Sequence, residues 1–338
     1  MARLVILGGG IAGQTAAPHA KTRLDGSQEV LVVTPNSLWN WTPSNIRVGV
    51  GVMQPEQVTF PLAPVYKKTG ITYYQAKAVS IHPEGDAETA QPFVTGEHPS
   101  PEKQGQREKV TCDYLINATG PKLNFDATPG LGPLHNSQSV GTFDHAAQAA
   151  KALDELVARM ERGEKKTIVI GTGHGTCTCQ GAAFEYLFNV EFGLRQRKVR
   201  PNANLIWISN EQELGDFGIG GRHVKRGGDI TRSRVFTESL YTERGVKRIT
   251  RAHVKEVGND TILYEDLDGN EKTVKFDFAM LPPPFAGVGL KAFDQRGRTS
   301  PPRFSPKADA CSWTAITNQS PTKNGCRPTG QGLSKSKI

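Results

Sequence analysis

The sequence predicts an α/β fold in which two parallel-sheet domains follow one another along the chain. Near residue 4 and again near residue 167, a short apolar run leads directly into closely spaced glycines. After each glycine cluster come a helix-compatible stretch and a second apolar run, which is the order of a parallel strand–helix–strand unit. A chain of 338 residues has room for about two domains of roughly 150 residues each. We therefore expect two Rossmann-like, three-layer dinucleotide-binding domains, with the C-terminal part incomplete.

The first unit begins with an apolar strand at Leu4–Leu7, and a helix over Gln14–Arg23 follows the glycines. Pro18 lies near the first turn of this helix, where its missing N–H is tolerated. Val30–Val33 is predicted to be the next strand. The stretch from Val79 to Glu108 is rich in Pro, Gly, Glu and Gln, which indicates strand edges and a surface excursion.

The second unit comes after a buried strand that ends at a glycine, Tyr114–Gly120. Its predicted elements are, in chain order, an amphipathic helix, a strand, a helix, a strand and a hairpin: Asp144–Glu161, Thr167–Ile170, Gln180–Arg197, Leu205–Ser209, and Thr261–Glu265 with Thr273–Phe276. This order predicts a first, interrupted domain over residues 1–143 and a second domain over 144–280. Residues 281–338 are expected to form a return segment and a disordered basic tail.

Composition excludes several classes of protein. The net charge of +8 suggests nucleic-acid binding, but from Arg296 onward eight Lys and Arg face one acid, so the preceding residues carry only about +1. No apolar run reaches the roughly 18 residues that cross a bilayer, and the first residues indicate a strand rather than a signal peptide. Five cysteines, an odd number, argue against a secreted disulfide framework, and no His/Cys spacing predicts a metal site. We expect a cytoplasmic protein that binds no nucleic acid, either free or resting peripherally at the inner face of the membrane.

The first glycine cluster has the spacing G-x-G-x-x-G at Gly8, Gly10 and Gly13, directly after a strand. Such glycines let the backbone turn tightly and approach a diphosphate. The diphosphate then lies against the first N–H groups and the positive dipole end of a helix, here at Ile11 and Ala12. This context favours nucleotide binding over a bare structural turn.

One part of the usual nucleotide site is missing. The acid that would hold a ribose hydroxyl at the end of the second strand is replaced by Thr34-Pro35-Asn36. We expect Thr34 or Asn36 to make this contact through a weaker hydrogen bond.

Five further segments resemble one branch of the flavoproteins that contain two dinucleotide-type domains. They are Trp41-Thr42-Pro43-Ser44-Asn45, Ala118-Thr119-Gly120-Pro121-Lys122-Leu123, Gln180-Gly181-Ala182-Ala183-Phe184-Glu185, Phe217-Gly218-Ile219-Gly220-Gly221 and Pro283-Pro284-Phe285. In combination they make residues 1–295 similar to sulfide:quinone oxidoreductases and to the flavoprotein of sulfide dehydrogenases. The resemblance implies bound FAD, with Thr42, Pro43 and Ser44 near the isoalloxazine ring. It also implies that Ala118, Thr119 and Gly120 contact the cofactor.

The second glycine loop departs from the fingerprint. Gly171 and Gly173 fit it, but the third glycine position holds Thr176, whose branched side chain hinders helix–strand packing and the approach of a second diphosphate. This favours a domain that keeps the fold and has lost NAD(H), as the resemblance implies. The strand after the loop ends Ser209-Asn210-Glu211, however, so an acid is close enough to keep a type II NADH:quinone oxidoreductase as an alternative.

Cys177 and Cys179 lie where the second glycine loop enters a helix, and a helix N-terminus lowers the pKa of a thiol. By resemblance, Cys179 is the redox-active cysteine that takes up sulfur and passes an electron pair to the flavin. Cys177 is then a resolving thiol. Two buried structural cysteines are the simpler alternative, since free cysteine is often a small core residue.

Two further residues match proton-transfer positions of the resembling proteins. His145 is suited to take a proton from sulfide because the pKa of histidine lies near neutrality. Glu185 is a second candidate for moving protons, with a solvated or capping glutamate as an equal alternative. Gly141 stands where those proteins carry another cysteine, so the usual pair of cysteines is not present.

After Asp294 the resemblance stops, and the composition turns to Ser, Pro, Lys and Arg without apolar periodicity, which indicates disorder. The genetic code offers a second explanation. Codons for Asn318–Gly325 can be chosen so that a frame one base earlier encodes K-P-K-P-Y-E-E-W, which looks like the family's continuation. We hypothesise a reading-frame slip near Gln295 to Gly297, which sequencing of the gene and the protein's mass would test. Cys311 and Cys326 should then not be credited with the role of the cysteine that the family's missing segment supplies.

These observations predict an FAD-dependent oxidoreductase that passes electrons from sulfide or a related sulfur compound, through flavin, to quinone or another acceptor. The alternative enzyme is a type II NADH:quinone oxidoreductase-like flavoenzyme. The alternative that is not an enzyme is an inactive truncated remnant that binds FAD poorly.

Overall fold

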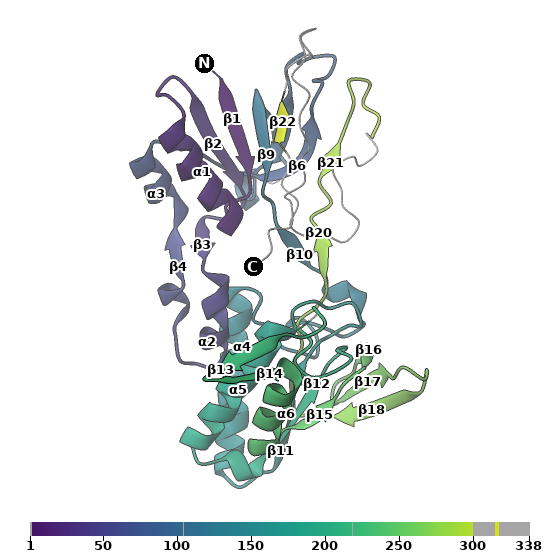
Figure 1. The fold of residues 1–338 in the computed structure, drawn as a ribbon. Coiled ribbons are helices and arrows are strands. Elements are labelled where there is room, and N and C mark those ends of the chain that lie inside the picture. The colour runs from purple at the N-terminus through teal and green to yellow at the C-terminus, as the bar shows by residue number, and fades with distance from the viewer. Residues whose placement is uncertain (1, 104, 218, 300–314, 318–338) are drawn as a thin grey trace.

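The computed structural model describes residues 2–103, 105–217, 219–299 and 315–317. It contains two parallel sheets, one in the upper and one in the lower half of Figure 1. Each sheet packs helices on one face and antiparallel strands on the other, so both halves have three layers. The α/β fold with two parallel-sheet domains, predicted from the two glycine clusters, is confirmed.

The first sheet has the order β22-β9-β1-β2-β5, in which β22 is antiparallel to its neighbour and the others are parallel. Its strands are β1 (Arg3–Leu7), β2 (Glu29–Thr34), β5 (Thr72–Gln75), β9 (Tyr114–Asn117) and β22 (Ala315–Thr317). Helices α1 (Ile11–Arg23) and α3 (Leu62–Thr69) cover one face. Helix α1 begins before the predicted Gln14 and continues through Pro18.

An antiparallel meander covers the other face of the first sheet. It consists of β6 (Lys77–His82), β7 (Phe93–Glu97) and β8 (Arg107–Thr111), with β21 (Lys291–Ala292) parallel to β6 at the edge. The stretch Val79–Glu108, expected to hold strand edges and a surface excursion, thus contributes three strands of this meander, and the residues between them connect the strands. The composition of the stretch did not indicate these strands, because most of its Pro and Gly residues lie in the turns between them.

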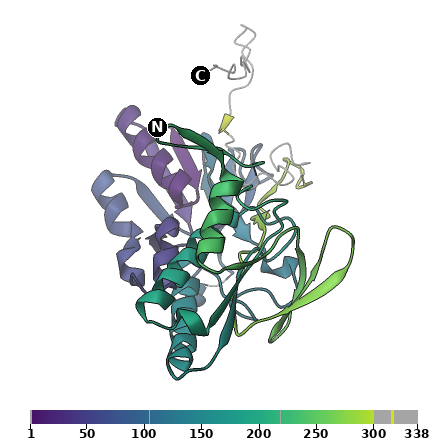
Figure 2. The same ribbon diagram turned by 60° about the horizontal axis from the view of Figure 1, so that its bottom comes forward.

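The second sheet has the order β15-β12-β11-β19, and all its strands are parallel. The strands are β11 (Lys166–Gly171), β12 (Ala203–Ile208), β15 (Lys247–Ile249) and β19 (Phe278–Met280). Helices α4 (Phe143–Glu161), α5 (Gln180–Gln196) and α6 (Ser233–Glu243) pack on one face. In Figure 2 the teal α4 and α5 and the green α6 lie together, apart from the yellow-green strands of the opposite face.

That opposite face is covered by an antiparallel sheet of β16 (His253–Val257), β17 (Thr261–Glu265) and β18 (Glu271–Lys275). The last two strands are the predicted hairpin. A separate hairpin joins β13 (His223–Arg226) to β14 (Asp229–Arg232). After β19, the chain runs back toward the first sheet through β20 (Phe285–Gly287), which pairs with β10 (Pro121–Leu123).

A segment between β2 and β5 ties the two halves together. It contains the paired strands β3 (Leu38–Asn40) and β4 (Thr59–Pro61), the turn η1 (Thr42–Ser44) and the short helix α2 (Asn45–Gly49). Helix α2 packs against α4 and α5. The Tyr186 hydroxyl of α5 donates to the Gly49 carbonyl at 3.0 Å, and a Cβ on Gly49 would lie 2.7 Å from Val140. Because α2 follows η1 directly, this contact connects η1 to α5.

Two predictions, one about membrane-spanning segments and one about the C-terminal tail, can be compared with the structure in part. No helix of the described residues is both long and apolar enough to span a bilayer. Residues 315–317, within the tail expected to be disordered, form β22 beside β9. Residues 300–314 and 318–338 of the tail, which include Cys311, Cys326 and the segment Asn318–Gly325, lie outside the described residues.

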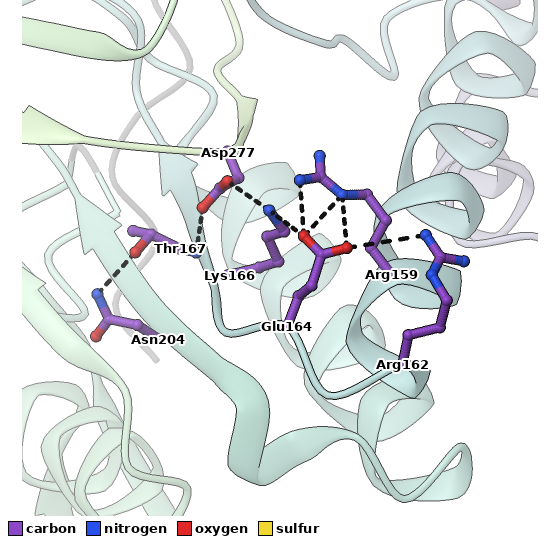
Figure 3. Close-up of polar contacts among 7 residues, drawn as sticks. All are labelled: Arg159, Arg162, Glu164, Lys166, Thr167, Asn204 and Asp277. Atoms are coloured by element: carbon purple, nitrogen blue, oxygen red, sulfur yellow. Dashed lines mark hydrogen bonds and ion pairs between the residues drawn. The ribbon is translucent and has the colours of Figure 1, made fainter.

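An ion network holds the start of the second sheet (Figure 3). Lys166 begins β11, and its Nζ lies 3.0 Å from Glu164 and 3.2 Å from Asp277. Arg159 of α4 contacts Glu164 at 2.7 Å, and Asp277 accepts the Thr167 N–H at 2.8 Å. Hydrogen bonds from Arg159 and Lys166 lower the pKa of Glu164 to about 2.

This network predicts acid sensitivity. A carboxylate whose pKa is depressed in the folded state stabilises the fold above its ordinary pKa of 4.5 and loses that contribution as the pH falls toward 2. The Glu164→Gln variant should therefore unfold more easily than wild type at pH 7, and the difference should vanish near pH 2. Urea unfolding between pH 7 and pH 2 measures it. A constant difference across this range, or an equal effect from the exposed Glu56→Gln, would rule the network out as the cause.

Candidate active site

The first glycine loop has room for no side chain at two of its three glycines. Gly8 has a φ of +103°, and a Cβ there would overlap the Ala118 carbonyl. A Cβ on Gly13 would overlap the Gly8 carbonyl, so this glycine lets α1 approach the end of β1. Gly10 differs, because a Cβ there would have no protein atom within 4 Å. The backbone at Gly10 therefore faces open space.

The same loop presents a row of free backbone donors. The Gly8 N–H is used by the Val33 carbonyl at 2.8 Å, and the first bond of α1 runs from Gln14 N–H to the Gly10 carbonyl at 2.9 Å. Between them, the N–H groups of residues 9–13 have no acceptor within the described part of the chain. Free N–H groups and the positive end of the 13-residue helix α1 together favour an anionic group such as a diphosphate.

The other predicted cofactor residues lie at or near this edge of the sheet. Strands β1, β2 and β9 are parallel, so the loops that follow them meet at their carboxyl ends. Thr34 is 1% exposed and packs under Gly9, whereas Asn36 is exposed; Asn36 is thus the better placed of the two for a ribose. After β9, Ala118 and Thr119 are half-buried and Gly120 is exposed with a φ of +70°.

The turn η1 places Thr42 and Pro43 at the surface, with Ser44 half-buried. Nearby, Trp39 stacks between Trp41 and Phe60, with ring centroids 5.7 Å and 4.8 Å apart. An exposed turn on an aromatic base is compatible with contact to a flat ring system. The aromatic base itself was not identified from the sequence.

The second glycine loop, residues 171–179, has most of its N–H groups occupied. The N–H groups of residues 172, 173, 175, 176 and 177 donate to acceptors of the protein at 2.8 to 3.1 Å. Two of the acceptors are imidazole nitrogens, Nδ1 of His253 and Nδ1 of His174. A loop whose donors are satisfied in this way has few left for a diphosphate.

Glu211 is the acid because of which an NADH site remained an alternative, and its side chain is buried in the protein. It is 4% exposed, and its carboxylate accepts the Ser209 hydroxyl at 2.9 Å and the Phe217 N–H at 2.8 Å. Burial raises its pKa. The expectation that this acid is available to a ribose is therefore wrong.

The two cysteines of the loop have different surroundings. Cys177 is 1% exposed, its thiol donates to the carbonyls of Pro282 and Pro283 at 3.4 and 3.5 Å, and burial raises its pKa to about 12. Cys179 is the half-buried N-cap of α5. Burial raises its pKa too, and the Ala182 N–H opposes the shift only in part. The predicted lowering of the thiol pKa is wrong, because desolvation outweighs the helix end.

The predicted proton carriers do not contact the cysteines through hydrogen bonds within the described residues. His145 lies in the first turn of α4, half-buried against Phe125 at 5.8 Å, and burial lowers its pKa. Its buried Nδ1 has no partner among the described residues. Glu185 is exposed on α5 and lines a groove of about 610 Å³ together with Phe184, Phe188 and Phe236.

Two amide side chains that the sequence did not single out hold the loop that carries the cysteines. Asn210 donates to the carbonyls of Gly175 and Cys177 at 2.7 and 3.0 Å. Gln180 donates to the Cys177 carbonyl at 2.9 Å and to Asn210 at 3.0 Å. The available signal was position, since Asn210 follows the strand where a dinucleotide domain has its ribose ligand.

A comparison with known families decides which family this site belongs to. The sequence profile of the pyridine nucleotide-disulphide oxidoreductases matches residues 2–192, more than half of the chain. The chain belongs to this family. Its members are FAD-binding flavoproteins.

Individual family members resemble the chain to different degrees. A sulfide-quinone reductase of Aquifex aeolicus is 31% identical over 289 residues, which are 86% of this chain and 60% of that protein. The crystal structure of the sulfide:quinone oxidoreductase from Aquifex aeolicus superposes with a TM-score of 0.72 at 30% identity, again over 86% and 60% of the two chains. NDH2 of Plasmodium falciparum, at 15% identity and a TM-score of 0.65 over 86% and 56%, shares the fold. The chain thus spans about 60% of the length of the relative it matches.

The residues at the first glycine loop fit the family's cofactor. FAD has a diphosphate, and the loop offers free N–H groups together with a backbone left open at Gly10. At Gly141, by contrast, a Cβ would lie 2.5 Å from the Leu123 side chain, so a cysteine there would require Leu123 to move. The Leu123 side chain thus occupies the space that a side chain at position 141 would need.

Proposed function

We propose that this chain is the FAD-binding and sulfur-handling part of a sulfide:quinone oxidoreductase-type flavoenzyme. Residues 1–143 bind FAD, and residues 144–280 carry the thiol loop. Electrons pass from sulfide or a related sulfur compound to quinone or another acceptor. The observation that carries the proposal is the contrast between the two glycine loops: the first has five N–H groups without an acceptor among the described residues, and the second has most of its N–H groups bonded to the protein.

The first loop supplies the cofactor site. Residues 9–13 bind the diphosphate, Asn36 contacts the ribose, and η1 with Ala118–Gly120 contacts the rest of the cofactor. When bound, FAD accepts an electron pair from a sulfur donor. The printed names of the Aquifex relatives, a sulfide-quinone reductase and a sulfide:quinone oxidoreductase, support this assignment.

Cys179 carries the sulfur step. Its thiol and a hydrosulfide ion would form one S–S bond, giving a persulfide, one proton and two electrons, and FAD held by the first loop would supply the acceptor for that electron pair. Cys179 serves because it is half-buried and therefore within reach of a small anion, whereas Cys177 is closed off by the carbonyls of Pro282 and Pro283. His145 takes the released proton, since a neutral imidazole has a free lone pair and its buried Nδ1 has no partner among the described residues.

NADH is disfavoured as the electron donor. Its diphosphate would meet a loop whose N–H groups are used, and its ribose would find Glu211 buried. We expect NADH to leave the absorbance of the bound flavin unchanged under anaerobic conditions, while dithionite bleaches it. Bleaching by NADH at stoichiometric amounts would favour the type II NADH:quinone oxidoreductase instead.

The proposed function is tested with the purified full chain loaded with FAD. Sodium sulfide added anaerobically should bleach the flavin absorbance, and a water-soluble quinone should restore it. If FAD binds but sulfide never bleaches it, the sulfur assignment is wrong. If FAD does not bind at all, the chain is the inactive remnant.

A further inference from the structure

We propose that Asn210 and Gln180 are positioning residues that hold the thiol loop and thereby set where Cys179 lies. The thiol loop is the second glycine loop, residues 171–179. This inference rests on the proposed function of Cys179. It assigns a role to two side chains whose amide nitrogens donate to the backbone of the loop.

Asn210 joins the end of β12 to the loop from both its backbone and its side chain. Its N–H donates to the Thr172 hydroxyl at 3.1 Å, where Thr172 is fully buried. Its amide nitrogen donates to the carbonyls of Gly175 and Cys177 at 2.7 and 3.0 Å. The loop is therefore fixed to the second sheet at three points along its length.

Gln180 closes the arrangement from the helix side. It is 3% exposed, and its amide nitrogen bridges the Cys177 carbonyl and the Asn210 side-chain oxygen at 2.9 and 3.0 Å. The Cys177 carbonyl thus accepts from both amides. Because a buried carbonyl without a donor is costly, the backbone cannot rotate here without losing both bonds.

Cys179 lies between these two fixed points. The held carbonyl of Cys177 precedes it by two residues, and Gln180 follows it directly. On the other side of the loop, Gly175 approaches His253 so closely that a Cβ would overlap the ring, and the Gly175 N–H donates to that ring at 2.8 Å. With both sides of the loop held, the thiol of Cys179 has little freedom to move relative to α5.

The position of Asn210 explains why a dinucleotide-type domain can do this. In such domains the residue after the second strand points at a ribose. Here the same position points back at the loop that would otherwise bind the diphosphate. A residue at a position that binds a nucleotide in other dinucleotide-type domains here holds the loop that carries Cys179.

The test compares Asn210→Ala and Gln180→Met with a matched control, Asn204→Ala. Asn204 lies near the start of β12, whereas Asn210 follows the end of this strand. The Asn204 amide donates to the Thr167 hydroxyl at 3.2 Å (Figure 3). Two readouts are taken on each full-length protein. One is the rate at which iodoacetamide labels Cys179, by peptide mass, with buried Cys112 as the internal reference for global unfolding. The other is the rate of flavin bleaching by sulfide relative to that by dithionite.

In the two loop variants, iodoacetamide should label Cys179 at least about fivefold faster than in wild type, because the loop opens locally. The labelling rate of Cys112 should not change. Bleaching by sulfide should slow roughly 10- to 100-fold, since a thiol misplaced by about 1 Å reacts poorly. Bleaching by dithionite should not change. Asn204→Ala should match wild type in every readout.

The proposal is overturned if the loop variants have a lower melting temperature but show the wild-type rates of Cys179 labelling and of flavin bleaching. That result would indicate a purely structural role for the two amides. It is also overturned if Asn204→Ala behaves as they do. Failure of the proposed function looks different: wild type would resist bleaching by sulfide, or Cys179→Ser would bleach normally. In either case the labelling rates still decide whether Asn210 and Gln180 hold the loop.

Discussion

Replacing Gly10 with alanine is expected to weaken FAD binding roughly 100-fold while leaving the apoprotein folded. A Cβ at Gly10 meets no protein atom, so the fold has no reason to change. It does project from the loop that we propose binds the diphosphate, and losing one or two hydrogen bonds to a charged group costs about 3 kcal/mol. Flavin fluorescence quenching on titration with FAD measures the affinity, and urea unfolding of the apoprotein measures the stability.

Gly13→Ala is the matched control from the same motif. Its Cβ would overlap the Gly8 carbonyl, so helix α1 must shift away from β1. Here we expect a loss of roughly 1 to 3 kcal/mol in the free energy of unfolding of the apoprotein, together with the loss of FAD. If Gly10→Ala destabilised the apoprotein as much as Gly13→Ala, or if it bound FAD normally, the open backbone at Gly10 would not be the diphosphate contact.

Cys179→Ser should slow flavin bleaching by sulfide by at least about a thousandfold, because the group that bonds to sulfur is removed. Bleaching by dithionite, which needs no thiol, should be unaffected. Cys177→Ser is the matched control two residues away. A serine hydroxyl can donate to the carbonyls of Pro282 and Pro283 in place of the thiol, so the sulfide rate should stay within about threefold of wild type.

Stopped-flow absorbance at the flavin band gives both rates. Equal losses in the two variants would return Cys177 to the role of resolving thiol that the sequence suggested. No loss in either would place the sulfur chemistry elsewhere in the chain.

The parts of the site that were predictable from the sequence are local. The glycine spacing at Gly8, Gly10 and Gly13 determines a turn and a helix start within a few residues, so its geometry follows from the sequence alone. The same locality allowed the absence of the third glycine at Thr176 to be noticed.

The parts that were missed depend on contacts between distant segments. Burial raises the pKa of both thiols, and for Cys177 the burying contacts include the carbonyls of Pro282 and Pro283, which lie more than 100 residues away in the sequence; a helix-end rule takes no account of such contacts. The His253 bond to the loop joins residues 78 positions apart. Glu211 looked available because its position after β12 was visible in the sequence while its orientation was not.

The reading-frame hypothesis for the tail is tested by sequencing the gene and measuring the protein's mass, because the segment after Thr317 lies outside the described residues. The described structure does show that the chain leaves the second sheet, pairs β20 with β10, and reaches the meander of the first sheet through β21. The aberrant composition thus begins after the chain has returned to the half that we propose binds FAD.

Calorimetric titration of the apoprotein with FAD, and separately with NADH, tests most directly the claim that one glycine loop is open and the other is closed. We predict binding of one FAD per chain and no heat from NADH. Uptake of NADH by wild type that persists in Gly10→Ala would show that the second loop accepts a dinucleotide, and an apoprotein that takes up no FAD would show that the first does not.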